Sequence, residues 1–158
     1  MKPMEDARPP FKIMKILVLG LPGAGKTTLA KELQKRLNSS ILINGDEVRA
    51  SISTDLGFSH QDRIRQAERI GFMADMIVRS GGTAIYDFVC PTDETRVAFS
   101  LRNPADYTIW VSRGVTKCRY ADTNQMWTAP KHVNVCVEDA ELPASVVAEK
   151  IVNHLWLS

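Results

Sequence analysis

A glycine-rich segment at residues 20–27 has the residue types and spacing of a phosphate-binding loop. Its sequence, GLPGAGKT, matches the Walker A pattern G-x-x-x-x-G-K-[ST] at every fixed position. Backbone N–H groups of such a loop turn inward around phosphates, and the positive N-terminus of the following helix points at them. We expect Lys26 to reach the β- and γ-phosphates and the Thr27 hydroxyl to ligate Mg²⁺. The residues predicted to bind ATP are Gly20, Gly23, Ala24, Gly25, Lys26, Thr27 and Thr28.

Two carboxylates, Asp46 and Asp87, lie at the ends of short apolar runs and join Lys26 as candidates for catalysis. Asp46 could orient an acceptor hydroxyl or hold Mg²⁺ through water, and its alternative role is that of a helix N-cap. Asp87 ends a run typical of a Walker B strand and could act as a general base or as an outer-shell Mg²⁺ ligand. Its alternative is a strand-end carboxylate bonded to the backbone or to an arginine.

Four arginines, Arg49, Arg63, Arg65 and Arg69, follow the first of these carboxylates. Guanidinium groups bind phosphate and sulfate oxyanions in a bidentate manner, so the cluster predicts an anionic acceptor. The alternative is a solvated helix face, which we favour for Arg65.

The pattern of apolar residues predicts alternating strands and helices, which would position these side chains. Short apolar runs predict strands at 13–19, 41–43, 83–87, 107–111 and 133–137, and four-residue spacing predicts helices at 28–38, 61–79 and 92–101 and from 143 onward. This order predicts an α/β fold of the P-loop NTPase type, a five-stranded parallel sheet with helices on both faces. We expect residues 1–11 to be a flexible tail, residues 12–158 to be one domain, and about 113–131 to form a lid.

Composition narrows the class of protein further. The chain has 158 residues and a net charge of +2, too weak to indicate a nucleic-acid or membrane partner. It contains no apolar run near the ~20 residues that cross a bilayer, and its three cysteines fit neither a zinc site nor a disulfide framework. We therefore expect a cytoplasmic protein. Short P-loop chains without an N-K-x-D guanine motif are typical of kinases for small acceptors.

Several segments together resemble the adenylylsulfate kinase family. They are residues 20–30, 45–49 (GDEVR), 55–63 (DLGFSHQDR), 69–71 and 88–91 (FVCP), and the D-L-G-F-S-x-x-D-R string is the most distinctive. The resemblance implies transfer of the ATP γ-phosphoryl group to the 3′-hydroxyl of adenosine 5′-phosphosulfate, giving 3′-phosphoadenosine 5′-phosphosulfate.

The resemblance also implies an acceptor site. Arg49 and Arg63 would grip the phosphosulfate, and Phe58 would stack on the adenine. Gln66 stands where the family has an asparagine contact. The main chain at Phe88, Val89 and Cys90 would line the pocket.

The chain departs from the family in two places. In the lid, Ala121 and Asn124 replace an arginine and a lysine, and the loop that should follow is short. Arg113, Lys117 or Arg119 could supply the lost charge, and Tyr120 and Trp127 could either stack on a base or pack. The second departure is Asp87, where the family usually has a small residue.

Two alternatives remain, and the first follows from the lid and Asp87, because an open site with an extra carboxylate suits a bulkier acceptor. One is a kinase acting on a hydroxyl of a nucleotide or of DNA, such as 5-hydroxymethyluracil in phage DNA, in which case the protein would work in the host cytoplasm. The other is a nucleotide-binding module without catalysis. We expect no membrane partner, and the sequence leaves a homodimer open.

Overall fold

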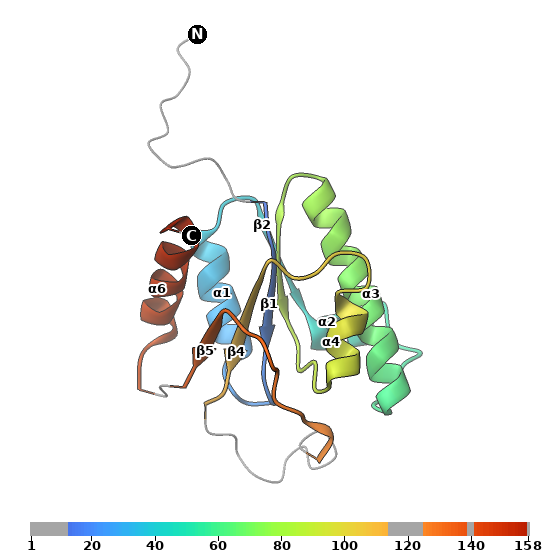
Figure 1. Ribbon diagram of the computed structural model, residues 1–158. Coiled ribbons are helices and arrows are strands. Elements are labelled where there is room, and N and C mark those ends of the chain that lie inside the picture. Colours follow the sequence, from blue (N-terminus) through green and yellow to red (C-terminus); the bar gives the residue numbers. More distant parts are fainter. Residues whose placement is uncertain (1–12, 114–124, 139–140, 158) are drawn as a thin grey trace.

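The computed structural model describes residues 13–113, 125–138 and 141–157, which fold around a five-stranded parallel sheet (Figure 1). The strand order is β2-β3-β1-β4-β5, and every neighbouring pair is parallel, which confirms the predicted fold class. The strands are β1 (Lys15–Leu19), β2 (Ser40–Asn44), β3 (Thr83–Asp87), β4 (Tyr107–Val111) and β5 (Val135–Val137). The helices are α1 (Lys26–Arg36), α2 (Gly45–Ser51), α3 (His60–Arg79), α4 (Asp93–Phe99) and α6 (Ala144–Leu157).

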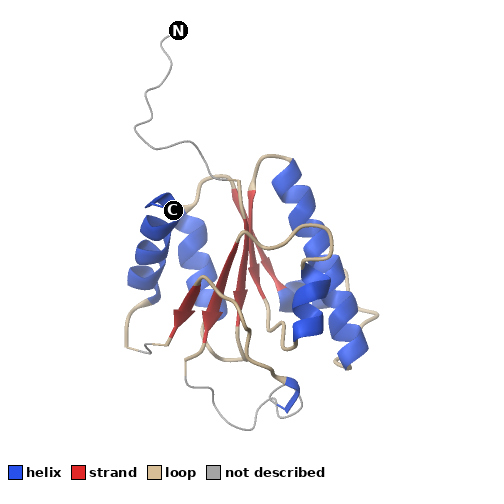
Figure 2. Cartoon of the chain, viewed as in Figure 1, coloured by secondary structure: helices blue, strands red, loops and turns tan. Residues whose placement is uncertain are grey.

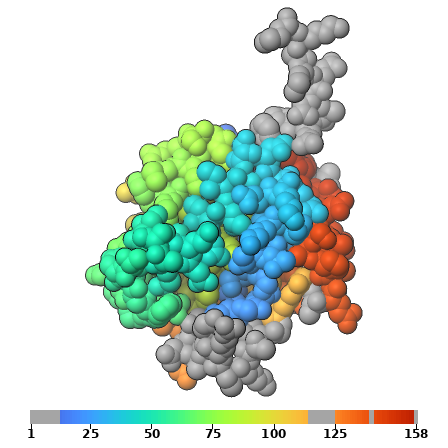
Figure 3. Space-filling model, turned by 180° about the vertical axis from the view of Figure 1, so that it is seen from behind, coloured from blue at the N-terminus to red at the C-terminus, as the bar shows by residue number. Residues whose placement is uncertain are grey.

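Helices cover both faces of the sheet, with α1 and α6 on one side and α2, α3 and α4 on the other (Figure 2). Side chains alternate along a strand, so β1 supplies a core on each side. Ile16 and Val18 pack with α1 and α6, whereas Leu17 and Leu19 pack under α3 and α4. From behind, the surfaces of α1 and of the α2–α3 region lie next to each other, and α6 lies at the edge (Figure 3). No helix in the described ranges is long and apolar enough to span a bilayer.

Parallel pairing brings the functional segments to one edge of the sheet. The carboxyl end of β1 leads into the phosphate loop, β3 ends at Asp87, and β2 ends at Asn44. In the β2–β3 ladder, Asn44 and Asp87 are register partners, and Asp87 in turn is partnered with Val18 of β1. Open α/β sheets bind ligands outside this edge.

The predicted elements all form, with boundaries that shift by a few residues, and α2 is a helix that the sequence pattern did not predict. Helix α2 has only seven residues, which is too few to show the helical repeat of apolar residues in the sequence. The first strand begins at Lys15, not at residue 13, because Ile13 is exposed. The predicted tail, residues 1–11, lies outside the described part of the chain. So do residues 114–124 of the predicted lid.

A buried ion pair ties β1 to the helices on one face. Lys15 Nζ lies 3.0 Å from Asp75 Oδ1 of α3, and both side chains are almost fully buried. The same ammonium donates to the carbonyl oxygens of Phe99 at 2.9 Å and Asn103 at 2.7 Å. One charged group thereby joins the central strand, α3 and the end of α4.

Breaking this pair should destabilise the fold. Lys15→Met is expected to lower the free energy of unfolding by about 3–5 kcal/mol, because Asp75 would keep a buried charge without its partner. Lys15→Met/Asp75→Leu removes both charges and should be more stable than the single variant. Urea unfolding measures both changes. A single variant as stable as the wild type would contradict this account.

Candidate functional site

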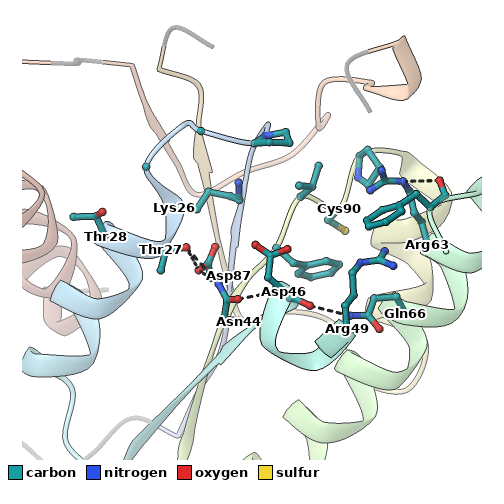
Figure 4. A pocket seen from close by; sticks show the side chains of 18 residues that line it. Lys26, Thr27, Thr28, Asn44, Asp46, Arg49, Arg63, Gln66, Asp87 and Cys90 are labelled. Atoms are coloured by element: carbon teal, nitrogen blue, oxygen red, sulfur yellow. Dashed lines mark hydrogen bonds between the residues drawn. The ribbon is translucent and has the colours of Figure 1, made fainter. Parts of the chain in front are cut away.

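A cavity of about 690 Å³ opens at the carboxyl edge of the sheet. On one side it is lined by the phosphate loop and the start of α1, namely Pro22, Gly23, Gly25, Lys26, Thr27 and Thr28. The remaining lining residues are Asn44, Gly45, Asp46, Arg49, Phe58, Arg63, Gln66, Asp87, Phe88, Val89, Cys90 and Pro91. Lys26, Thr27 and Asp87 lie on one side, Arg49 and Arg63 lie on the other, and Asp46 lies between them (Figure 4).

The phosphate loop adopts a conformation that its glycines permit. Gly23 and Gly25 have φ angles of 82° and 95°, which residues with a Cβ atom rarely adopt. Gly25 is the N-cap of α1, so Lys26 is the first residue of that helix. Lys26 Nζ donates to the carbonyl oxygen of Leu21 at 2.9 Å. Burial lowers the pKa of Lys26 from its ordinary value, and the negative charges of Asp87 and Asp46 counteract part of this effect.

Two residues of the Walker A segment contribute to its shape and are absent from the cavity lining. Ala24 is buried in the core beside α1, and its N–H donates to the carbonyl oxygen of Leu21 at 3.2 Å. A Cβ on Gly20 would lie 2.4 Å from the carbonyl oxygen of Val111, so the loop leaves β1 in close contact with β4. Thr28 borders the cavity, but its side chain points away from Asp46 and Asp87 (Figure 4).

Thr27, Asp87 and Asn44 form a compact hydrogen-bonded group. The Thr27 hydroxyl donates to Asp87 Oδ2 at 2.5 Å. Asn44 Nδ2 donates to the same carboxylate oxygen at 2.7 Å and to Thr27 Oγ1 at 3.3 Å. Asp87 is only 2% exposed, yet it borders the cavity. Its Oδ2 is thus engaged by the side chains of Thr27 and Asn44.

Asp46 is exposed in the middle of the cavity wall, in the first turn of α2. The N-cap of α2 is Asn44, whose Oδ1 accepts from the N–H groups of Asp46 at 3.0 Å and Glu47 at 3.1 Å. The alternative role of Asp46 as an N-cap is therefore wrong. Helix α2 can start this close to β3 because residue 45 is glycine, where a Cβ would lie 2.7 Å from Phe88 Cβ.

A short turn holds Arg49 and Arg63 on the side of the cavity opposite Lys26. Arg49 donates to the carbonyl oxygen of Gly57 at 2.7 Å, and Arg63 Nε donates to that of Phe58 at 3.1 Å. Their guanidinium carbons lie 4.6 Å and 5.5 Å from the centroid of the Phe58 ring, which is 66% exposed. Asp62 Oδ2 accepts from Gly57 N–H at 2.9 Å and fixes the turn. Two cations are thereby oriented before any ligand arrives.

The other two arginines of the cluster do not line the cavity. Arg65 is exposed on α3, as expected for a solvated helix face. Arg69 pairs with both carboxylate oxygens of Asp55, at 2.7 and 2.8 Å, and also donates to Ser53 Oγ at 3.2 Å. Arg69 therefore anchors the segment between α2 and α3.

The remaining predicted acceptor residues border the cavity from α3 and from the segment that follows β3. Gln66 is buried and donates through Nε2 to the carbonyl oxygen of Gly45 at 3.2 Å, which joins α3 to the start of α2. Phe88, Val89 and Cys90 follow β3 along the wall, and Cys90 has a φ angle of 48°. Burial raises the pKa of the Cys90 thiol to about 12, so the thiol stays protonated at neutral pH.

The lid prediction can be followed only in part, since residues 114–124 lie outside the described segments. This range contains Lys117, Arg119, Tyr120, Ala121 and Asn124. Arg113 is described, and it donates to the carbonyl oxygen of Leu142 at 3.1 Å and is not part of the cavity wall. Trp127 packs against Trp110, with ring centroids 6.3 Å apart, and beneath the Arg96 guanidinium. Trp127 thus makes packing contacts with Trp110 and Arg96.

Sequence reasoning missed Asn44. An asparagine at the end of a strand, directly before Gly-Asp-Glu, is a common N-cap signal and could have revealed α2. Its contacts with Asp87 and Thr27 depend on strand pairing, which a local pattern does not contain.

Comparison with known proteins identifies the family. The adenylylsulphate kinase family profile matches residues 12–136. The chain belongs to this family. It is 35% identical over 114 residues to the adenylyl-sulfate kinase of Shewanella baltica, an alignment that spans 68% of the chain and 56% of that protein. A probable adenylyl-sulfate kinase of Pseudomonas aeruginosa is 40% identical over 81 residues, or 49% of the chain and 38% of the relative. The chain thus spans about half the length of the curated relatives it matches.

Solved structures agree with a P-loop kinase fold. The chain resembles the Mycobacterium tuberculosis APS kinase in complex with AMPPNP and APS with a TM-score of 0.80, covering 93% of the chain and 99% of that structure at 18% identity. A hexameric APS kinase from Thiobacillus denitrificans gives a TM-score of 0.70 at 27% identity, covering 90% of the chain and 29% of that structure. The chain therefore has the same fold as these structures, although its sequence departs from the family pattern in the lid and at Asp87.

The Arg69–Asp55 pair predicts a measurable effect of pH. Hydrogen bonding to Arg69 lowers the pKa of Asp55 from 3.8 to about 2 in the folded chain. A carboxyl whose folded pKa is depressed stabilises the fold above its unfolded pKa and loses that contribution as the pH falls through the folded value. Arg69→Gln should return the Asp55 pKa toward 3.8 and remove this contribution.

NMR titration of the Asp55 carboxyl measures the shift directly. Arg79→Gln, an exposed arginine in the last turn of the same helix, is the matched control and should leave the titration unchanged. An Asp55 pKa that stays near 2 in Arg69→Gln would mean that another group depresses it.

Proposed function

We propose that the protein transfers the γ-phosphoryl group of ATP to the 3′-hydroxyl of adenosine 5′-phosphosulfate. The observation that carries this proposal is one cavity that joins the Walker A loop to the oriented pair Arg49 and Arg63. A donor triphosphate and an anionic acceptor can occupy such a cavity together. Membership of the adenylylsulphate kinase family supports the choice of acceptor.

The donor side fits a triphosphate and a divalent cation. Lys26 presents a cation beside the loop, and the α1 N-terminus directs backbone N–H groups toward the same space. Thr27 Oγ1 accepts from Asn44 and donates to Asp87, which leaves one lone pair of the hydroxyl for Mg²⁺. Thr27 would hold the ion directly, and Asp87 and Asp46 would act through water; bound Mg²⁺ supplies neutralisation of the phosphate charge.

The acceptor side fits an aromatic nucleotide with a charged tail. Arg49 and Arg63 provide guanidinium donors for phosphate or sulfate oxygens. Phe58 exposes most of its ring next to them and can carry a base. Phe88, Val89 and Cys90 also line the cavity.

Asp46 is placed to receive the proton in the transfer step. The 3′-oxygen attacks the γ-phosphorus, the bond to the β-phosphate oxygen breaks, and ADP leaves. The hydroxyl proton passes to the exposed Asp46 carboxylate and then to solvent. Asp87 is the less suitable base, because its Oδ2 already accepts from Thr27 and Asn44.

A γ-phosphate transfer assay tests the proposal. Wild-type protein with Mg²⁺ and labelled ATP should place label on adenosine 5′-phosphosulfate, whereas Lys26→Met should abolish transfer because it removes the cation at the phosphates. DNA containing 5-hydroxymethylpyrimidines is the second acceptor, and ATP without acceptor is the blank. Label on DNA alone would overturn the proposed acceptor, and label on neither would overturn the proposed catalysis.

The position of Arg49 in the cavity predicts that its loss affects the KM for the acceptor and not the KM for ATP. Arg49→Ala should raise the acceptor KM about tenfold or more and leave the KM for ATP nearly unchanged, since one charge-assisted contact is lost on the acceptor side only. Arg65→Ala removes an equal charge from the exposed face of α3 and serves as the control. An unchanged acceptor KM in Arg49→Ala would place the acceptor elsewhere.

A further inference from the structure

We propose that Asn44 is a positioning residue that holds Thr27 and Asp87 in place for the metal-bound nucleotide and links them to the acceptor helix α2. The turnover part of this inference rests on the proposed function, whereas the part concerning nucleotide binding does not. The inference comes from the Asn44 side chain, whose amide nitrogen donates to Thr27 and Asp87. Its amide oxygen accepts from the first N–H groups of α2.

The nitrogen of Asn44 acts on the donor side. It bonds to Asp87 Oδ2 at 2.7 Å, the same oxygen that accepts the Thr27 hydroxyl at 2.5 Å. A hydrogen bond to a charged acceptor is stronger than one between neutral groups. The amide therefore fixes the rotamer of Asp87 and, through it, the direction of the Thr27 hydroxyl.

The oxygen of Asn44 acts on the acceptor side. It receives the N–H groups of Asp46 and Glu47, which begin α2. Asp46 and Arg49 both extend from this helix into the cavity. Moving Asn44 would therefore move the start of the helix that carries the proposed base and one oxyanion-binding arginine.

The residue type matches its surroundings on both sides. Register pairing places residue 44 directly beside residue 87 across the β2–β3 ladder, so their side chains must be compatible. A carboxylate at 44 would oppose Asp87 with a like charge, and a serine would cap α2 but has no side-chain amide to donate to Asp87. Asparagine supplies a donor for the carboxylate and an acceptor for the helix.

Two substitutions at Asn44 separate its two contributions. Asn44→Ser keeps a capping oxygen and removes the amide, whereas Asn44→Ala removes both. We expect both variants to lose most of the Mg²⁺-dependent part of the rise in Tm that ATP causes, and to lower kcat about tenfold. Only Asn44→Ala should also raise the acceptor KM several-fold, because only it loses the cap.

Exchanging the residue types of the register partners Asn44 and Asp87 tests the contact between their side chains. Asp87→Asn should be impaired, and Asn44→Asp/Asp87→Asn should recover at least about a third of the lost Mg²⁺-dependent Tm shift, because the exchange restores one amide beside one carboxylate. Ser51→Ala, at the other end of α2 and outside the cavity, controls for damage to the helix. Its Tm shift and kinetic constants should match those of the wild type.

The readouts distinguish this inference from the proposed function. Tm shifts with ATP in Mg²⁺ and in EDTA require no acceptor, so they test Asn44 even if adenosine 5′-phosphosulfate is not phosphorylated. A wild-type Mg²⁺-dependent shift in Asn44→Ser, or an exchange variant no better than Asp87→Asn, would overturn the role of the amide. Equal acceptor KM values in Asn44→Ser and Asn44→Ala would overturn the link to α2.

Discussion

The Thr27 hydroxyl donates to a buried carboxylate, Asp87, at the edge where three parallel strands end. A carboxylate at 2% exposure needs hydrogen bonds to offset the loss of water, and Thr27 and Asn44 provide them. The bond can form only where β1, β3 and β2 lie side by side in this register. The phosphate loop, the start of α1 and the start of α2 are thus placed relative to one another by one shared acceptor oxygen.

Charge is distributed across the cavity in a way that suits two anionic ligands. Lys26 lies at the phosphate-loop end, Arg49 and Arg63 lie at the opposite end, and Asp46 lies between them. The two arginines are already held by backbone carbonyls of the 57–58 turn, so little side-chain freedom remains to be lost on binding. Phosphoryl transfer depends mainly on positioning and charge neutralisation, and in the proposed function this cavity would provide both from separate elements.

The segments that support the site are themselves fixed by ion pairs away from it. Arg69 holds Asp55 in the segment before the 57–58 turn, and Lys15 holds Asp75 on the inner face of α3. Helix α3 thereby presents Arg63 and Gln66 to the cavity while its remaining charged residues serve the fold or the solvent. Within one arginine-rich stretch, neighbouring residues of the same type do different work.

The sequence by itself determined the phosphate loop, the five strands and the position of Asp87, because each depends on local spacing or on short apolar runs. It also supported the family and the acceptor residues that line the cavity. Only the tertiary structure decided that Asn44 joins the two sides of the site and that Arg69 belongs to Asp55 and not to a ligand. The contacts of Asn44 with Asp87 and of Arg69 with Asp55 join residues 43 and 14 positions apart, across a ladder and a turn, and no local pattern records which distant group a side chain will meet.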